Sequence, residues 1–134
     1  MKVKILFSII ASLLMISCSS EKQVHNTDIE VAQAFIQNIL DNKFEEAEKF
    51  VLKEETNEEY FKLFKTEYKS KSKEDLENYR NADIIINEIA PVNDSVSIIN
   101  YSNSYIRDKS NKLKMVRVNG KWLVDLKYTF SGNL

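Results

Sequence analysis

The chain reads KLKMVRVNGKWLVD over residues 112–125, and this stretch decides the fold. Apolar and polar residues alternate on both sides of Asn119-Gly120, the pair most typical of a two-residue type I′ hairpin turn, because both turn positions need positive φ. Alternation of this kind is the pattern of strands with one buried face. The sequence therefore predicts an antiparallel hairpin, with strands over residues 112–118 and 121–128.

The two-residue turn also sets which residues face each other across the hairpin. The predicted core-side pairs are Val118–Lys121, Arg117–Trp122, Met115–Val124 and Leu113–Leu126, and the pairs on the opposite face are Lys114–Asp125 and Val116–Leu123. Asp125 is thus expected to lie on the outer face. Val116 and Leu123 leave a small apolar spot on that otherwise charged face, a candidate interaction patch for the protein's own tail or for a partner.

Two further strands are predicted before the hairpin. β-branched residues become frequent after Asn81, and residues 91–94 (PVND) have the composition of a turn. The pattern predicts strands over residues 82–90 and 95–105, followed by a polar loop over residues 107–111. With the hairpin, these strands make an expected antiparallel sheet of about four strands.

Three helices are predicted before the sheet. Residues 27–30 (TDIE) have the form of a capping box, and Asn42 is expected to cap a short second helix. Residues 56–59 (TNEE) form a second capping box that opens a third helix, which either continues through residues 70–73 (SKSK) or breaks there. The apolar residues expected to face inward are Ala32, Phe35, Ile36, Ile39 and Leu40 in the first helix, Phe44, Ala47, Phe50 and Val51 in the second, and Tyr60, Phe61, Phe64 and Tyr68 in the third.

The start of the chain has the pattern of a signal peptide. Lys2 and Lys4 precede an apolar run over residues 5–16, which is shorter than the roughly 20 residues of a membrane-spanning helix. The run closes in LMISC at residues 14–18. This closing stretch resembles the lipobox of bacterial lipoproteins, with Met15 where leucine is usual.

The resemblance implies that a signal peptide over residues 1–17 is removed and that the thiol of Cys18 carries lipid. Cys18 is the single cysteine of the chain, so no internal disulfide can form. We therefore expect a bacterial envelope protein whose partner is the membrane, held through Cys18. Ser19 follows the cysteine, and by resemblance to enterobacterial sorting this favours the outer membrane. Residues 18–26 form the expected tether, and residues 27–130 form a single domain.

Charge and composition exclude several classes of function. Removing Lys2 and Lys4 from the 19 basic residues leaves 17 against 20 acidic residues, a formal charge of −3, which argues against a nucleic-acid partner. Two glycines cannot build a glycine-rich phosphate loop. No group of His, Cys, Asp or Glu has the spacing of metal ligands. Neither a cofactor nor a metal is predicted.

Helices followed by about four antiparallel strands, ending in Asn-Gly-Lys-Trp-Leu-Val-Asp over residues 119–125, resemble the nuclear-transport-factor-2-like (cystatin-like) α+β superfamily. Within it, the chain looks like small uncharacterised lipoprotein domains that are common in Bacteroidota. The resemblance covers about residues 27–128. It implies a curved sheet wrapped around the long helix, forming a cone that is an open pocket in some relatives and filled in others.

Enzymes of this superfamily place carboxylate, tyrosine or histidine side chains inside the cone, where burial shifts their pKa values. The single histidine, His25, lies in the expected tether. A cone-pocket isomerase or dehydratase would instead need Glu88 or Asp83 buried beside Tyr60 or Tyr101, although exposed edge-strand charges are the simpler expectation. No catalytic residue is assigned.

Five aromatic side chains would line an open cone, or pack as core if the cone is filled: Phe35, Phe61, Phe64, Trp122 and Tyr128. The favoured interpretation is a lipid-anchored, non-catalytic domain that binds a small apolar ligand or an envelope protein. The alternatives are the cone-pocket enzyme and a structural or assembly component of the envelope that uses Val116 and Leu123.

Overall fold

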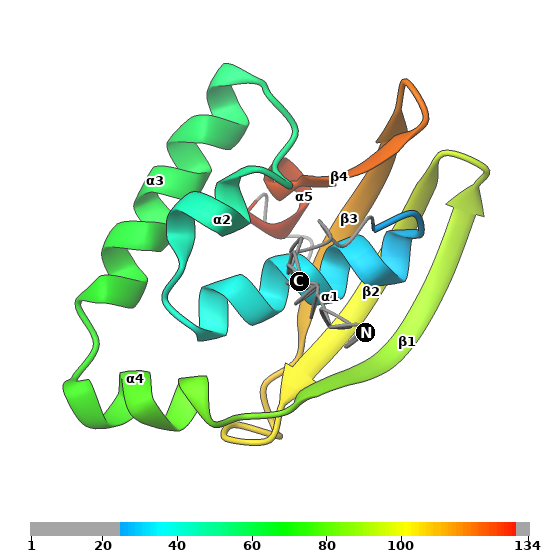
Figure 1. Cartoon of the computed structure of the whole chain (residues 1–134). Coiled ribbons are helices and arrows are strands. Elements are labelled where there is room, and N and C mark those ends of the chain that lie inside the picture. Colours follow the sequence, from blue (N-terminus) through cyan, green and yellow to red (C-terminus); the bar gives the residue numbers. More distant parts are fainter. Residues whose placement is uncertain (1–24, 131–134) are drawn as a thin grey trace, which may run out of the picture.

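A computed structural model of the chain describes residues 25–130 and shows an α+β fold (Figure 1). In this part of the chain, five helices accompany one sheet of four antiparallel strands, which are hydrogen-bonded in the order β1-β2-β3-β4. The predicted signal peptide and Cys18 lie outside the described residues.

Helix α1 (Asp28–Leu40) begins at the predicted capping box. The Glu30 amide donates to Thr27 Oγ1 at 3.2 Å, and the Thr27 amide donates to Glu30 Oε2 at 3.0 Å. Backbone hydrogen bonds from Asn26 and Thr27 hold the pKa of Glu30 below its ordinary value. The buried residues of α1 recur at helical spacing, so one face of the helix joins the core: Val31, Ala32, Phe35, Ile36, Ile39 and Leu40.

Helix α2 (Phe44–Glu48) follows after a tight turn, and its predicted cap is wrong. Lys43 is the N-cap residue and makes no side-chain capping bond. Asn42 instead has φ of 59°, the left-handed conformation that asparagine tolerates better than most residues. It therefore turns the chain between the two helices. Phe44 and Ala47 are buried, as expected.

The predicted third helix is divided into α3 (Glu55–Lys69) and α4 (Lys73–Arg80). The break falls at residues 70–72, where Ser72 Oγ accepts from the Asp75 amide at 3.1 Å and caps α4. The second capping box is wrong, because α3 already begins at Glu55 and has Glu54 as its N-cap. Asn57 is thereby placed inside the helix, and its side chain is fully buried.

The sheet consists of β1 (Ile84–Asn93), β2 (Val96–Asn103), β3 (Asn111–Val118) and β4 (Lys121–Asp125). Five of the six predicted hairpin pairs form, from Lys114–Asp125 to Val118–Lys121. The sixth, Leu113–Leu126, does not form because β4 ends at Asp125, and Val118 and Lys121 are exposed instead of lying on the core side. Asn119 and Gly120 have φ of 51° and 77°, as a type I′ turn requires. The earlier turn falls at residues 94–95 instead of 91–94, because β1 continues through Pro91 at the edge of the sheet, where proline is tolerated.

Strand β4 is shorter than predicted and gives way to helix α5 (Leu126–Phe130), so Tyr128 lies on a helix. The other edge of β4 is covered. The Val124 amide donates to the Phe50 carbonyl at 2.8 Å, and the Leu52 amide donates to the Val124 carbonyl at 2.9 Å. β4 is an outer strand of the sheet, and its outer edge is thus hydrogen-bonded to Phe50 and Leu52.

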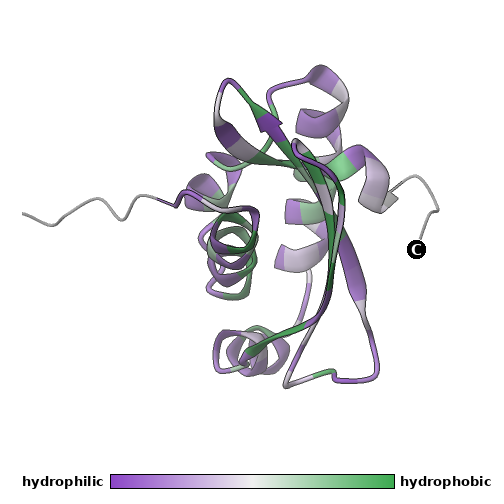
Figure 2. Cartoon of the chain, turned by 90° about the vertical axis from the view of Figure 1, so that its right-hand side faces the viewer, coloured by the Kyte–Doolittle hydropathy of each residue, from purple (hydrophilic) through white to green (hydrophobic). Residues whose placement is uncertain are grey.

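Helices α1 and α4 lie on the same side of the sheet, which Figure 2 shows edge-on. Helix α1 contacts all four strands, and α5 contacts β3 and α3. The inward-facing strand residues Ile99, Leu113, Met115 and Val124 meet the apolar face of α1 in one core. No described helix is long and apolar enough to span a membrane.

Candidate ligand cavity

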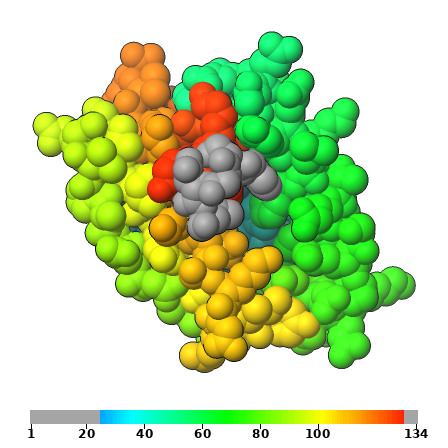
Figure 3. Space-filling model, turned by 180° about the vertical axis from the view of Figure 1, so that it is seen from behind, coloured from blue at the N-terminus to red at the C-terminus, as the bar shows by residue number. Residues whose placement is uncertain are grey.

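A cavity of about 260 Å³ lies between α1, the α3–α4 pair, the inner face of the sheet and the loop after β2. Its apolar lining comes from α1, β3 and the start of α5: Phe35, Ile36, Ile39, Leu40, Leu113 and Leu126. Seen from behind, the surface is hollowed between the sheet and α3 (Figure 3). The hollow is possible because α3 and α4 bend apart at residues 70–72 instead of forming one rod.

Three tyrosines from different elements line this cavity: Tyr68, Tyr79 and Tyr101. The Tyr68 hydroxyl donates to the Leu40 carbonyl at 3.3 Å, and burial raises the pKa of Tyr68. Burial also raises the pKa of Tyr101 to about 12. No hydrogen bond joins the Tyr101 hydroxyl to another residue within 25–130. Tyr101 therefore brings to the cavity a hydroxyl group that no other described residue pairs.

Asn103 lies two residues beyond Tyr101 on the same face of β2, since strand side chains alternate. Its side chain is buried, and Oδ1 accepts from the Tyr105 amide at 3.0 Å and from the Ile106 amide at 2.9 Å. These two bonds orient the amide and leave Nδ2 as a donor with no partner among the described residues. The alternating pattern of β2 could have shown that Asn103 faces inward.

Charged side chains reach the cavity from two segments that are far apart in the sequence. Glu67 and Lys71 come from the end of α3 and the break after it, and Lys109 comes from the loop after β2. Lys71 Nζ lies 5.7 Å from the centre of the Tyr79 ring, a cation–π contact. Neither lysine forms an ion pair within residues 25–130.

The structure brings two of the five predicted pocket aromatics to this cavity, namely Phe35 and Phe64. Phe61 packs in the closed core against Phe44, with ring centres 6.0 Å apart. Trp122 is half-buried in β4, and Tyr128 is half-buried on α5. These three do not line the cavity.

The two residues of the predicted interaction patch face each other in the structure. Val116 faces Leu123 across the hairpin, and Val96 of β2 faces Val116 from the other side. All three side chains are half-buried. The row is therefore a partly exposed apolar strip on the outer face of the sheet.

The residues of the enzyme alternative do not meet in the cavity. Asp83 and Glu88 are both exposed and contribute nothing to its lining, so the structure does not provide the buried carboxylate beside Tyr101. His25 is half-buried, and its ring packs edge-on against Phe50 with centres 5.7 Å apart. Within residues 25–130, no three His, Cys, Asp or Glu side chains are grouped so that they could hold a metal ion.

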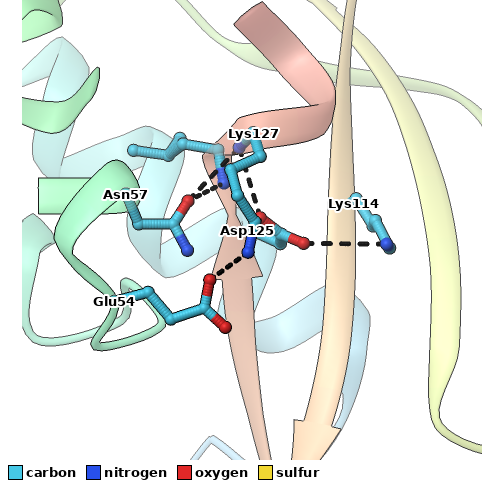
Figure 4. Close-up of polar contacts among 6 residues, drawn as sticks. Glu54, Asn57, Lys114, Asp125 and Lys127 are labelled. Carbon is cyan, nitrogen blue, oxygen red and sulfur yellow. Dashed lines mark hydrogen bonds and ion pairs between the residues drawn. The ribbon is translucent and has the colours of Figure 1, made fainter. Parts of the chain in front are cut away.

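A second buried polar group lies where β4 passes into α5 (Figure 4). Asn57 Oδ1 accepts from the backbone amides of Leu126 and Lys127, at 2.9 and 3.2 Å. Asp125 faces Lys114 on the outer side of the hairpin, as predicted, with Lys114 Nζ 3.6 Å away. Its side chain is nevertheless buried. Asn57 lies on the same face of α3 as Phe61 and Phe64, so its helical spacing from them could have indicated that it is buried.

Lysine and glutamate complete this polar group. The Lys127 ammonium donates to Glu54 and lies 3.9 Å from Asp125 Oδ1. The hydrogen bond to Glu54 raises the pKa of Lys127. These contacts tie the start of α3 to the start of α5, which closes that end of the core.

Comparison of the chain with models of known families, with curated proteins and with solved structures finds no match.

Proposed function

We propose that this protein is a non-catalytic binding module that takes a small apolar molecule into the cavity between α1, the α3–α4 pair and the sheet. The observation that carries the proposal is the cavity itself, about 260 Å³ with walls of phenylalanine, isoleucine and leucine. Protein interiors are otherwise close-packed, with few voids larger than a water molecule. An apolar space of this size therefore suits an apolar guest.

The proposed fold relationship is to the nuclear-transport-factor-2-like superfamily, in its open-cone form. Two features support it: α1 crosses all four strands on one face of the sheet, and the cavity lies between them. In this arrangement the hairpin forms the closed end of the cone, and the loop after β2 borders the open end. The cavity is then the site that the cone provides.

Binding is favoured over catalysis by the chemistry of the lining. The one carboxylate in it is Glu67, which is exposed, whereas a general acid or base is normally tuned by burial or by a close charged neighbour. The buried tyrosines have raised pKa values, so their hydroxyls stay protonated at neutral pH. These groups can hold a ligand but are poor proton acceptors.

The proposed location of the protein is the bacterial envelope, most consistently the outer membrane. Lipid on Cys18 would hold the domain near a membrane, and two or three acyl chains anchor stably where one does not. Metabolic labelling with a palmitate analogue should mark the full chain and leave the Cys18→Ala variant unlabelled. Equal labelling of both chains would refute the lipid anchor on Cys18 and would leave the proposed ligand binding in the cavity unaffected.

Methyl NMR of the full chain in lipid nanodiscs tests the binding proposal, with 1-octanol as the probe. Methyl signals of Ile36, Leu113 and Leu126 should shift, and those of Ile98, on the opposite face of the sheet, should not. Because a bulky indole would fill the space, Ile106→Trp should abolish the shifts. Val118→Trp, at an exposed hairpin position, is the matched control and should retain them. If the methyl signals of the cavity residues do not shift when octanol is added, the proposal is refuted.

A further inference from the structure

We propose that the ligand is an amphiphile with an anionic oxygen end, a monocarboxylate carrying an apolar body of roughly eight carbons. This inference rests on the proposed function, because it assigns a ligand class to the same cavity. Its basis is that hydrogen-bond donors and positive charges outnumber negative charges among the polar residues of a lining that is otherwise phenylalanine, isoleucine and leucine. Hydrogen bonds from such donors to a charged acceptor are about twice as strong as neutral ones.

Asn103 is the fixed donor at this end. Its side chain is more than nine-tenths buried, and Oδ1 is already occupied by two backbone amides, so the amide cannot turn over without losing both bonds. In the described part of the chain, the buried side-chain atoms without a partner are Asn42 Oδ1 and Asn57 Nδ2. Nδ2 of Asn103 makes no hydrogen bond to another described residue, and Asn103 belongs to the cavity lining. A ligand oxygen would satisfy it.

Other donors line the same cavity. Tyr101 lies on the same face of β2, and Asn111 faces Tyr101 from β3. Lys109 and Lys71 add two positive charges to the lining, against the single negative charge of the exposed Glu67. The net charge of the lining therefore favours an anion over a cation or a neutral head group.

The volume limits the size of the ligand. At about 30 Å³ for each non-hydrogen atom, the share of a water molecule in the liquid, 260 Å³ holds roughly nine such atoms. A carboxylate with a chain of eight carbons has about this size. The apolar body would lie against Phe35, Leu113 and Leu126, and the carboxylate would lie against Asn103 and Tyr101.

The same methyl NMR titration of the full chain, with empty nanodiscs as the blank, measures how much the head group and the apolar body of a ligand each contribute to affinity. Octanoate, 1-octanol and octylamine present apolar chains of about the same length, ~7 or ~8 carbons, with three different ends. Octanoate should bind at least tenfold more tightly than octanol, and octylamine should bind more weakly than either. Equal affinity for all three would overturn the carboxylate assignment and leave the cavity function standing, whereas no binding of any probe would overturn both.

Asn103→Asp is the decisive variant, because it retains the Oδ1 acceptor for both backbone amides and replaces the donor with a negative charge. It should weaken octanoate about tenfold or more and leave octanol within about twofold. Lys109→Gln, in an exposed loop, should weaken octanoate alone, and Lys121→Gln, in the distant hairpin, is its control and should change neither. Octanoate affinity that is unchanged in Asn103→Asp would overturn the proposal.

Discussion

At opposite ends of the core, two buried asparagines each use the side-chain oxygen to accept from two backbone amides. They differ in the surroundings of the side-chain nitrogen. Asn57 Oδ1 accepts from the amides of Leu126 and Lys127, and Asn103 Oδ1 accepts from the amides of Tyr105 and Ile106. Nδ2 of Asn57 is buried without a partner among the described residues, whereas Asn103 lines the cavity and its Nδ2 bonds to no other described residue. One asparagine closes the structure, and the other leaves a donor available.

The contrast extends to the two ends of the sheet around them. At the hairpin end, Lys114, Asp125, Lys127 and Glu54 neutralise one another, and β4 is paired on both edges. At the other end, Lys109 has no ion-pair partner in the part of the chain that the structure describes. An exposed lysine without an ion-pair partner remains available to an anionic ligand.

The largest expected difference between the ends lies in their apolar residues. Met115 and Leu113 are both buried on the inner face of β3, but only Leu113 borders the cavity. Met115→Ala should lower the free energy of unfolding by about 3 to 4 kcal/mol. Leu113→Ala should lower it by about 2 kcal/mol, because a side chain that borders a void has fewer packing contacts to lose. Denaturant unfolding of both variants measures this difference.

A cost for Leu113→Ala equal to that of Met115→Ala would mean that the space beside Leu113 is packed, and the contrast between the two ends would fail. Methyl NMR supplies a second reading on the same variants. Leu113→Ala should enlarge the cavity and admit a longer alcohol than 1-octanol, whereas Met115→Ala should leave the size preference unchanged.

The next largest expected effect on the free energy of unfolding comes from replacing the two asparagines. Asn57→Ala should cost about 2 to 3 kcal/mol of unfolding free energy, because it leaves two buried backbone amides without an acceptor. Asn103→Ala should cost about 1 kcal/mol, since its two amide partners belong to a loop beside a hollow, where water can replace the lost acceptor. Denaturant unfolding of both variants tests the order.

Reversal of that order would show that the loop after β2 is the better sealed of the two sites. The conservative Asn57→Asp variant sharpens the comparison. It retains the Oδ1 acceptor but buries a negative charge near Asp125, so it should also destabilise, by an amount that shrinks as the pH is lowered and the carboxyl group is protonated.

Local patterns predicted the hairpin well. The Asn119-Gly120 turn fixes the register by itself, so all five facing pairs of β3 and β4 follow from a two-residue signal. The first capping box is equally local and was confirmed. The second failed because Thr56 and Glu59 lie inside α3, which begins at Glu55 under the influence of the tertiary contact that Asn57 makes with α5.

The cavity could not be located from periodicity. Alternation and helical spacing identify which residues face inward, and they placed Phe35, Phe64 and Trp122 on inner faces alike. Whether the space between those faces is filled depends on how far apart the helices lie. That separation depends on the break between α3 and α4, which the sequence left open, and on the turn of β4 into α5, which it did not predict.

The smallest expected effect concerns the bond that ties α4 to the open end. The Tyr105 hydroxyl donates to Asp75 Oδ1 at 2.8 Å, and this bond, with a second one from Ser72, holds the pKa of Asp75 below its ordinary value. A lowered carboxyl pKa in the folded state stabilises the protein above the unfolded pKa, about 3.9, and this stabilisation is lost as the pH falls through the folded value.

Tyr105→Phe should therefore raise the pKa of Asp75 toward its ordinary value and flatten the stability profile below about pH 4. A carboxyl NMR titration of the full chain measures the shift. Glu30 is the internal control, because its low pKa comes from the capping box of α1 and should not move. An unchanged Asp75 pKa in Tyr105→Phe would mean that the loop after β2 is not fastened to α4 in solution, and the open end would then be wider than the structure shows.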